Sequence, residues 1–424
     1  MEKYWKHIEN KYYIERGMFV ILPLKYDVKI KFKDMSIMES KPIPFESSDF
    51  IELLANKCSM DGNFVRRYKL DVKLDPIQLD TEISITDLQL FVFDNGIAFL
   101  SAYLSYYNGN VGSIYKFIYP GYTDENEELK NIQALFLKNI SDKILSQLKP
   151  QMRWFITDIK SQSFILKEAY RLNVAYVPNR FKETDIINKI TYNEHRIINL
   201  SRDFEDLSEK DVEYVTGARD VDSKDYGWGC SITSQEISYA YSKGKAPLVE
   251  NANDDLLITM LVMYQKYTCM LLNEEIHQRY ISNNPSAMLK KSIQDLKRKA
   301  MKFIAYGTLV PSQISRWNNV CDTYRLLIEL NGINETIMEI KEKINLLNEE
   351  QERIDSKRES TIGMIIAIFG LTSIIGSILQ IVDYVSTGRV EMLISFVASI
   401  AGVLVFGAFI SRTLLAKKKC KGDV

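Results

Sequence analysis

The sequence predicts an α+β protein in which an α/β head is followed by a long-helix stalk and a two-helix transmembrane hairpin. Three observations support this class: strand patterns with turn residues in the first half, long helical patterns after residue 250, and two apolar stretches near the end. We expect the head over 1–250, the helical bundle and stalk over 251–360, the membrane hairpin over 361–415 and a basic tail over 416–424.

Composition narrows the function classes. The chain has 424 residues and a formal net charge of −1, so no nucleic-acid partner is expected. Its five cysteines lie far apart without a CxxC pair, which favours free thiols over disulfides or a zinc cluster. The three histidines are not at metal-ligand spacing, and the first residues lack an apolar core, so we expect no cleaved signal peptide.

The head shows local strand and helix patterns. Leu88–Tyr107 contains two strand patterns around Asn95-Gly96, which predicts a β-hairpin. Met18–Val28 and Tyr170–Pro178 have the pattern of further strands, and Asp124–Leu148 that of an amphipathic helix opened by acidic residues. These elements indicate a domain with antiparallel pairing.

Two places in the head are candidates for ligand binding. Gly217–Tyr241 is rich in Gly, Ser, Asp and aromatic residues, and such a loop can offer backbone N–H groups and a stacking ring to a polar ligand. The alternative is an ordered connecting loop with a buried tryptophan. At Arg153-Trp154 an arginine beside an aromatic ring can hold a phosphate or carboxylate, and the alternative is a surface ion pair. The candidate residues are Arg153, Trp154, Arg219, Asp220, Trp228, Ser231, Thr233, Ser234 and Gln235.

Catalytic signatures are missing from the sequence. It contains no GxGxxG, GxxxxGK, HExxH or GxSxG motif, so we expect a protein that is not an enzyme and has no cofactor.

The region after residue 250 is expected to be helical. Asn253–Asn284 and Pro285–Gly307 predict an antiparallel helix pair, and Pro311 restarts the chain. A stripe with 4-3-4-3 spacing then predicts a coiled-coil-like helix that packs between protomers or within one bundle. We expect one continuous helix from about Pro311 to about Val382. The stripe consists of Leu326, Leu330, Ile333, Ile337, Ile340, Ile344, Leu347 and Ile354, with Gln351 at its one polar position.

Two apolar stretches predict a membrane hairpin. Ile362–Val382 carries no charge and, as a helix of about 32 Å, is long enough to cross a bilayer. Val390–Leu415 is the expected second span. Lys357 and Arg358 precede the first span and a lysine-rich tail follows the second, so both flanks and both termini are expected in the cytoplasm. This topology places the chain in the inner membrane, in contact with lipid.

The first span carries a polar stripe. Either small residues let helices approach closely, or hydroxyl and amide oxygens line a path for hydrated cations, with a carboxylate at the mouth. Two helices enclose no lumen, so a pore needs several protomers. The candidate pore-lining residues are Thr372, Ser373, Gly376, Ser377, Gln380, Asp383 and Tyr384.

This order of elements resembles the CorA-type divalent-cation transporters. The segments "LFVFDNGIAFLS" and "WGCSITSQ" are most similar to the divergent CorA-like proteins associated with type III CRISPR systems. The resemblance implies a homopentamer whose first span lines the pore, and a head that binds a nucleotide second messenger of the S-adenosylmethionine–AMP type. The family's Gly-Met-Asn is replaced here by "QIVDYVSTGR", so magnesium selectivity is not implied.

The resemblance leads to three alternative functions. The first is an oligomeric cation channel gated by its head and acting in antiviral defence. The second is a transporter of Mg²⁺ or another divalent cation, closed by cations at acidic residues such as Asp220, Asp222 and Asp225. The third is a membrane-tethered binding or signalling protein whose hairpin is only an anchor.

Overall fold

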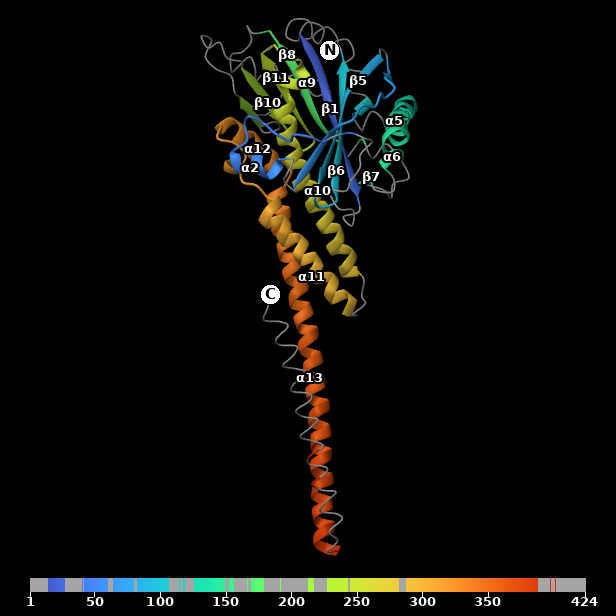
Figure 1. Cartoon of the computed structure of the whole chain (residues 1–424), viewed down its shortest axis with the longest axis vertical. Coiled ribbons are helices and arrows are strands. Elements are labelled where there is room, and N and C mark those ends of the chain that lie inside the picture. Colours follow the sequence, from blue (N-terminus) through green and yellow to red (C-terminus); the bar gives the residue numbers. More distant parts are fainter. Residues whose placement is uncertain are drawn as a thin grey trace. The chain divides into compact units, whose positions relative to one another are not determined.

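The computed structural model confirms the mixed α+β class, with one large sheet and several helices in its described part (Figure 1). The chain divides into two compact units, Met1–Glu342 and Lys343–Val424. The structure describes residues 14–26, 40, 42–59, 64–79, 82–106, 114, 117–118, 126–148, 152–155, 166, 169–178, 191, 213–216, 227–242, 245–281, 287–387, 397 and 401.

Within these ranges, eleven strands form a mainly antiparallel sheet. Their order is β2-β3-β5-β6-β1-β8-β11-β10-β9, with β4 paired to β5 and β7 to β1. The β8–β11 pair is parallel and the other pairs are antiparallel. The strands are β1 (Glu15–Tyr26), β2 (Pro42–Ile43), β3 (Val65–Lys69), β4 (Ile77–Gln78), β5 (Glu82–Phe93), β6 (Ile97–Tyr106), β7 (Met152–Trp154), β8 (Tyr170–Val177), β9 (Glu213–Thr216), β10 (Trp228–Ile232) and β11 (Glu236–Ser242).

The expected hairpin at Asn95-Gly96 is confirmed. Strands β5 and β6 flank this turn, and Phe91 pairs with Phe99 across it. Gly96 has φ of 97°, a left-handed conformation that glycine adopts without the steric cost of a side chain. The asparagine side chain also accepts a hydrogen bond from the backbone N–H of Ile97 at 3.3 Å. The turn therefore fixes the register of β5 against β6.

The described helices are α2 (Glu52–Cys58), α5 (Glu127–Ile140) with its continuation α6 (Ser146–Leu148), α9 (Leu248–Asn251), α10 (Asn253–Ile281), α11 (Ala287–Lys302), α12 (Asn318–Leu330) and α13 (Ile333–Thr387). Helices α5 and α10 pack on opposite faces of the sheet. Alternate residues of β1 point to opposite faces. Met18, Val20 and Leu22 share an apolar core with Phe136 and Leu137 of α5. We call this the α5 face and the other the α10 face.

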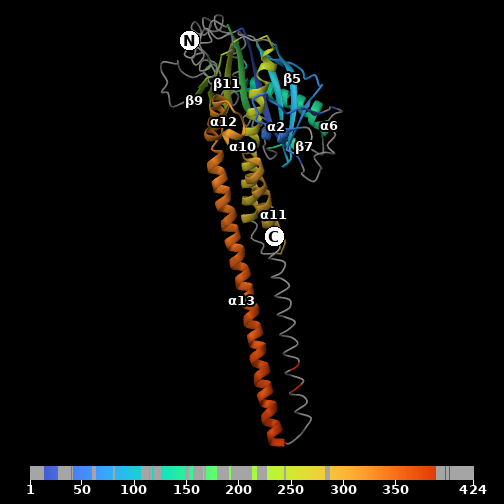
Figure 2. The ribbon, with the colours of Figure 1, turned by 60° about the vertical axis from the view of Figure 1, so that its left-hand side comes forward.

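Aromatic side chains hold α10 against the sheet. Tyr264 stacks on Phe93 with ring centroids 4.5 Å apart, and Tyr267 meets Phe99 edge-on at 5.5 Å. Large buried rings contribute much of the apolar area of such contacts. Figures 1 and 2 show α10 crossing the sheet and continuing beside α11.

The expected antiparallel pair of helices is confirmed over the described residues. Helices α10 and α11 follow each other along the chain, and Lys299 Nζ of α11 lies 2.8 Å from Glu275 Oε1 of α10. A π-helical turn, Phe303–Gly307, ends this second helix.

The expectation of one continuous helix from about Pro311 is wrong. A short 3₁₀ turn over Pro311–Gln313 precedes α12, and the chain breaks again between α12 and α13. Gly332 has φ of 60° at this break and donates its N–H to the Glu329 carbonyl at 2.9 Å. A left-handed glycine that satisfies the last carbonyls is a common helix stop. The long helix therefore begins at Ile333.

This break divides the predicted stalk stripe. Leu326 and Leu330 lie on α12, and Ile333 begins the part on α13. Ile333 and Ile340 are each 1% exposed within the single chain. The start of the stripe therefore packs inside the protomer, which is the second of the two alternatives for this segment, while pairing between protomers stays a prediction.

Candidate functional site

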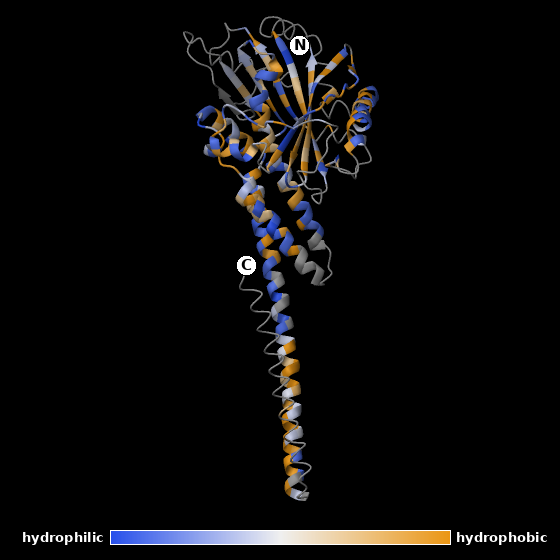
Figure 3. Cartoon of the chain, in the orientation of Figure 1, coloured by the Kyte–Doolittle hydropathy of each residue, from blue (hydrophilic) through white to orange (hydrophobic). Residues whose placement is uncertain are grey.

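One helix is apolar and long enough to cross a membrane. The segment Glu359–Asp383 of α13 has 25 residues, or about 37 Å of helix. Figure 3 shows the colour of α13 changing from hydrophilic to hydrophobic where this segment begins. Length and composition alone make it a weak indication of a span. The second expected span, 390–415, lies outside the described residues except for 397 and 401.

The polar stripe lies on the least exposed face of this segment. Ser373, Gly376, Ser377 and Gln380 are half-buried within the chain, as are Ile366 and Gly370 at compatible helical spacing. Large apolar residues such as Leu371, Ile375 and Leu379 are 57–64% exposed. A helix whose apolar residues are more exposed than its polar ones has the orientation expected in lipid.

Two hydroxyl groups in the apolar segment of α13 donate their hydrogens to the helix itself. Ser377 Oγ lies 2.9 Å from the Ser373 carbonyl oxygen, and Thr372 Oγ1 lies 2.8 Å from that of Ile368. Such bonding satisfies the donor without another helix. Each hydroxyl oxygen then has its lone pairs available to its surroundings. Hard cations bind to such oxygen ligands.

Two of the remaining predicted pore residues do not share this half-buried face. Thr372 and Asp383 are exposed, and Ser386 Oγ donates to the Asp383 carbonyl at 2.9 Å. Tyr384 lies on α13, but its side chain is outside the described part of the structure. The structure thus gathers four of the seven predicted residues on one face.

The expected binding loop at Gly217–Tyr241 is largely a β-hairpin. Trp228 and Ser231 lie on β10, and Thr233, Ser234 and Gln235 form its turn into β11. The interpretation as a loop is therefore wrong for 228–241, because alternating apolar residues in both strands are buried in the sheet. Arg219, Asp220, Asp222 and Asp225 lie outside the described residues.

The hairpin turns its two named side chains to opposite faces. Trp228 is a cross-strand neighbour of Tyr241 on the α10 face, whereas Ser231 pairs with Ser238 on the α5 face. Tyr241 Oη donates a 2.6 Å hydrogen bond to Asp255 of α10, which fixes the first assignment. One pocket cannot use both side chains.

Arg153 and Trp154 form a separate place in the sheet. They lie on β7, where Arg153 pairs with Lys25 near the end of β1. Arg153 is exposed, and Trp154 packs against the core under α5. Through the pairings of β10, β11 and β8, Trp228 lies in the same row of the sheet as Glu15 of β1. Lys25, the partner of Arg153, lies ten residues farther along β1. The two candidates are therefore separated by ten residues of strand, or about 34 Å. They do not form one site.

Sequence reasoning missed a buried polar cluster on β8, β11 and β10. Arg171 and Glu236 face each other on parallel strands, with Nε and Oε2 3.3 Å apart and side chains 4% and 1% exposed. In the next row, Asn173 Nδ2 donates to Ser238 Oγ at 2.9 Å. We call Arg171, Asn173, Glu236, Ser238 and Ser231 the polar cluster. Arginine and asparagine two residues apart in an otherwise apolar strand were the signal that could have revealed it.

A carboxylate at the start of α10 has a perturbed pKa. Burial raises the pKa of Asp255 to about 7, although hydrogen bonds from Tyr241 and Tyr239 act to lower it. Desolvation disfavours the charged form of a carboxyl group, and hydrogen bonds to the carboxylate favour it. Asp255 therefore titrates near neutral pH, where α10 meets the sheet.

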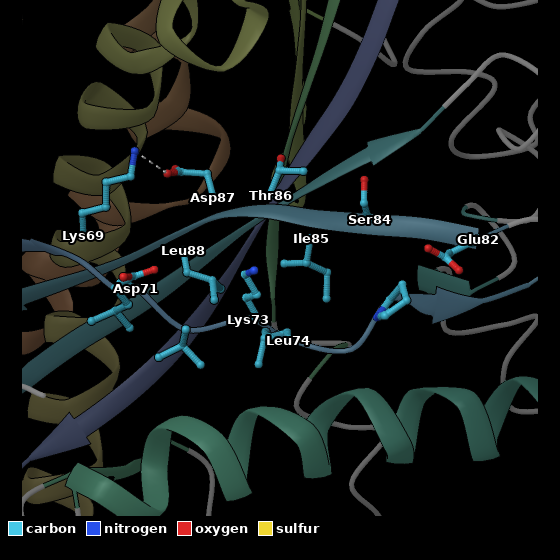
Figure 4. Close-up of a pocket in the computed structure, with 13 residues that line it drawn as sticks. Lys69, Asp71, Lys73, Leu74, Glu82, Ser84, Ile85, Thr86, Asp87 and Leu88 are labelled. Atoms are coloured by element: carbon cyan, nitrogen blue, oxygen red, sulfur yellow. Dashed lines mark ion pairs between the residues drawn. The ribbon is translucent and has the colours of Figure 1, made fainter.

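A groove of about 660 Å³ runs along the other end of the sheet, between the segment Lys69–Leu74 and β5. Figure 4 shows Lys69 and Asp87 at one end and Glu82 at the other. Lys69 Nζ lies 3.6 Å from Asp87 Oδ1. Charges of both signs line this groove, so it selects no single class of ligand.

Neither metal geometry nor relatedness assigns a function. Among the described residues, no group of three or more His, Cys, Asp and Glu side chains is arranged to hold a metal ion. A comparison with models of known protein families found no match, and a comparison with curated proteins found none.

Proposed function

We propose that this chain is one protomer of an oligomeric, CorA-like cation channel of the inner membrane, opened by a nucleotide second messenger that binds its head. The proposal includes two spans with both termini in the cytoplasm, a pentamer and a role in antiviral defence, as the resemblance implies. The observation that carries it is the half-buried polar face of the apolar segment of α13.

The chemistry of this face suits a cation. The Ser377 hydroxyl donates within the helix, and Gln380 adds an amide oxygen on the same half-buried face. A helix with such a face in lipid must turn it toward protein or water, because unsolvated polar groups are costly in hydrocarbon. Around a symmetry axis, repeated copies of the face would form an acceptor-rich path.

The glycines of the segment support assembly. A Cβ added at Gly370 or Gly376 would meet no atom within 4 Å in the described part of the chain. Close packing against the described residues therefore does not explain why these positions are glycine. A neighbouring protomer would use the space they leave, as small residues do between membrane helices.

The polar face is tested by ion flux into liposomes that contain the purified full-length protein. Replacing Ser373 and Ser377 by alanine and Gln380 by leucine together should lower flux at least tenfold. The matched control is Thr361→Val, because Thr361 Oγ1 also bonds within the helix, to the Lys357 carbonyl at 2.9 Å, but lies off the stripe. Size-exclusion chromatography checks that the variants still assemble.

The outcomes separate the three functions. Flux that needs a nucleotide messenger and falls only in the triple variant supports the gated channel. Mg²⁺ flux without a messenger, shut down as internal Mg²⁺ rises, identifies a transporter instead. No flux under any condition, with a biological activity that survives the triple substitution, identifies a membrane-tethered binding protein.

A further inference from the structure

The face of β8, β11 and β10 that carries the polar cluster departs from the usual chemistry of a sheet interior. Parallel strands that are buried on both faces normally carry apolar side chains on both. Here Asn173, Ser238 and Ser231 are each 0% exposed and follow one another in one row across three strands. The same face becomes apolar at β1, where Val20 and Met18 continue these rows.

Several polar atoms of the cluster have no partner within the described part of the chain. Asn173 Oδ1 and Ser231 Oγ are shielded from solvent and accept or donate no hydrogen bond there. Arg171 contacts Glu236 through Nε at 3.3 Å, and its side chain is only 4% exposed. Buried polar groups in folded proteins almost always have partners, and these atoms, unlike an isolated buried hydroxyl, lie together on one face where a single partner can serve them.

The helices on the opposite face do not provide those partners. Helix α10 meets the sheet through Tyr241 and Asp255, and α12 meets it through Cys230 and Thr323, whose Sγ and Oγ1 are 3.8 Å apart. Cys230 alternates with Ser231 along β10 and therefore points away from the polar cluster. The unpartnered atoms face the α5 side.

The donor and acceptor types define the occupant. The planar fork of Arg171 matches a phosphate or carboxylate, whereas Asn173 Oδ1 accepts and needs an N–H or O–H donor. Neighbouring strands lie about 4.8 Å apart and alternate residues about 7 Å apart along a strand. The cluster therefore spans roughly 10 Å by 7 Å, an area that one small molecule covers.

We infer that the polar cluster is a binding site for a small anionic ligand that also carries N–H or O–H donors. Arg171 holds the anionic group, and Asn173, with Ser231 beside it, holds the donor side. Because the atoms are shielded, a bound ligand is enclosed by the head, and enclosure couples binding to a change of its conformation. That this change opens a pore rests on the proposed function, whereas the binding does not.

The test is thermal unfolding of the detergent-solubilised full-length protein with three probes. Adenosine monophosphate supplies a phosphate and donors, adenosine supplies donors alone, and inorganic phosphate supplies the anion alone. We expect adenosine monophosphate to raise the unfolding midpoint by a few degrees, and the other two to raise it less. Asn173→Leu should weaken this binding about tenfold or more, and it should lower the midpoint of the unliganded protein only modestly, because Ser238 Oγ loses its donor.

Two further variants test whether the binding depends on the α5 face of the sheet. Ser231→Ala removes one oxygen and serves if Asn173→Leu does not fold. Ser101→Ala is its matched control, because Ser101 is 1% exposed and unpartnered within the described residues but lies on the α10 face beside Ile21. This variant should bind like the wild type.

Four results would overturn the assignment: no midpoint shift with any probe, an unchanged shift in both cluster variants, a full shift with phosphate alone, or a large loss of unliganded stability in Asn173→Leu. Flux through liposomes is measured separately. Binding of adenosine monophosphate without flux would keep the site and reject its role in gating.

Discussion

The buried ion pair of Arg171 and Glu236 should be worth far more than an exposed pair at shorter distance. Its atoms are 3.3 Å apart, and the side chains are 4% and 1% exposed. At an effective dielectric constant of about 20, two unit charges at this distance attract by about 5 kcal/mol. Glu236→Gln removes the carboxylate charge while keeping the shape and leaves the guanidinium buried, so we expect a loss of about 3–5 kcal/mol in the free energy of unfolding.

The exposed control is Asp75→Asn. Asp75 Oδ1 lies only 2.7 Å from Lys143 Nζ, but the Lys143 and Asp75 side chains are 36% and 74% exposed. Solvent screening limits such pairs to about 0–1 kcal/mol. The contrast between the two variants therefore tests whether burial, and not distance, decides the energy.

Thermal unfolding of the full-length protein in detergent measures both variants. The Glu236→Gln midpoint should fall by about 6–10 °C and the Asp75→Asn midpoint by about 2 °C or less. A double variant, Arg171→Met with Glu236→Leu, should recover part of the loss, because it removes the buried guanidinium together with the carboxylate. Equal midpoints for Glu236→Gln and Asp75→Asn would refute this reasoning. A double variant that is no more stable than Glu236→Gln would also refute it.

Three further predictions concern the backbone and pH. Gly17→Ala should lower the unfolding midpoint strongly, since the new Cβ would overlap the phenol ring of Tyr103. An unchanged midpoint would contradict this packing. Gly332→Ala should lower the free energy of unfolding by about 1–2 kcal/mol. The cause is the left-handed backbone alone, because no atom of the described chain lies within 4 Å of the added Cβ. Circular dichroism should show unchanged helix content. Burial raises the pKa of Asp255 from its ordinary value of 3.8 to about 7. The folded state therefore holds this proton more tightly than the unfolded state, and the resulting stabilisation is fully present below pH 3.8 and lost as pH rises through 7. In the Asp255→Asn variant, the unfolding midpoint should fall less steeply between pH 4 and 7. An equally steep fall in that variant would show that another group causes the pH dependence.

The local elements were predictable because short-range physics encodes them. The Asn95-Gly96 turn needs a left-handed glycine, and the strands of β5 and β6 carry β-branched and aromatic residues on both sides of it. Helix α10 begins with acidic residues at its N-terminus, as the sequence predicted. The break before α13 was missed because Gly332 alone does not reveal whether it lies inside a helix at a modest cost or ends one.

The candidate sites were predictable only where periodicity suffices. Spacing along one helix placed Ser373, Ser377 and Gln380 on a common face, and that face is the half-buried one. In the head, composition suggested a loop around Trp228, whereas the structure forms strands that send Trp228 and Ser231 to opposite faces. Turn-rich composition cannot distinguish a loop from a tight hairpin when the burial of the flanking residues is unknown.

The sequence by itself determined the elements that depend on neighbours along the chain: the β5–β6 turn, the amphipathic α5, the long α10 and the apolar segment of α13. Only the tertiary structure decided that β8 and β11 lie side by side in parallel and so bring Arg171 to Glu236 and Asn173 to Ser238. The physical reason is that strand alternation fixes which side chains share a face but not which strand lies next to it. That choice depends on the burial of apolar surface by segments far apart in the chain.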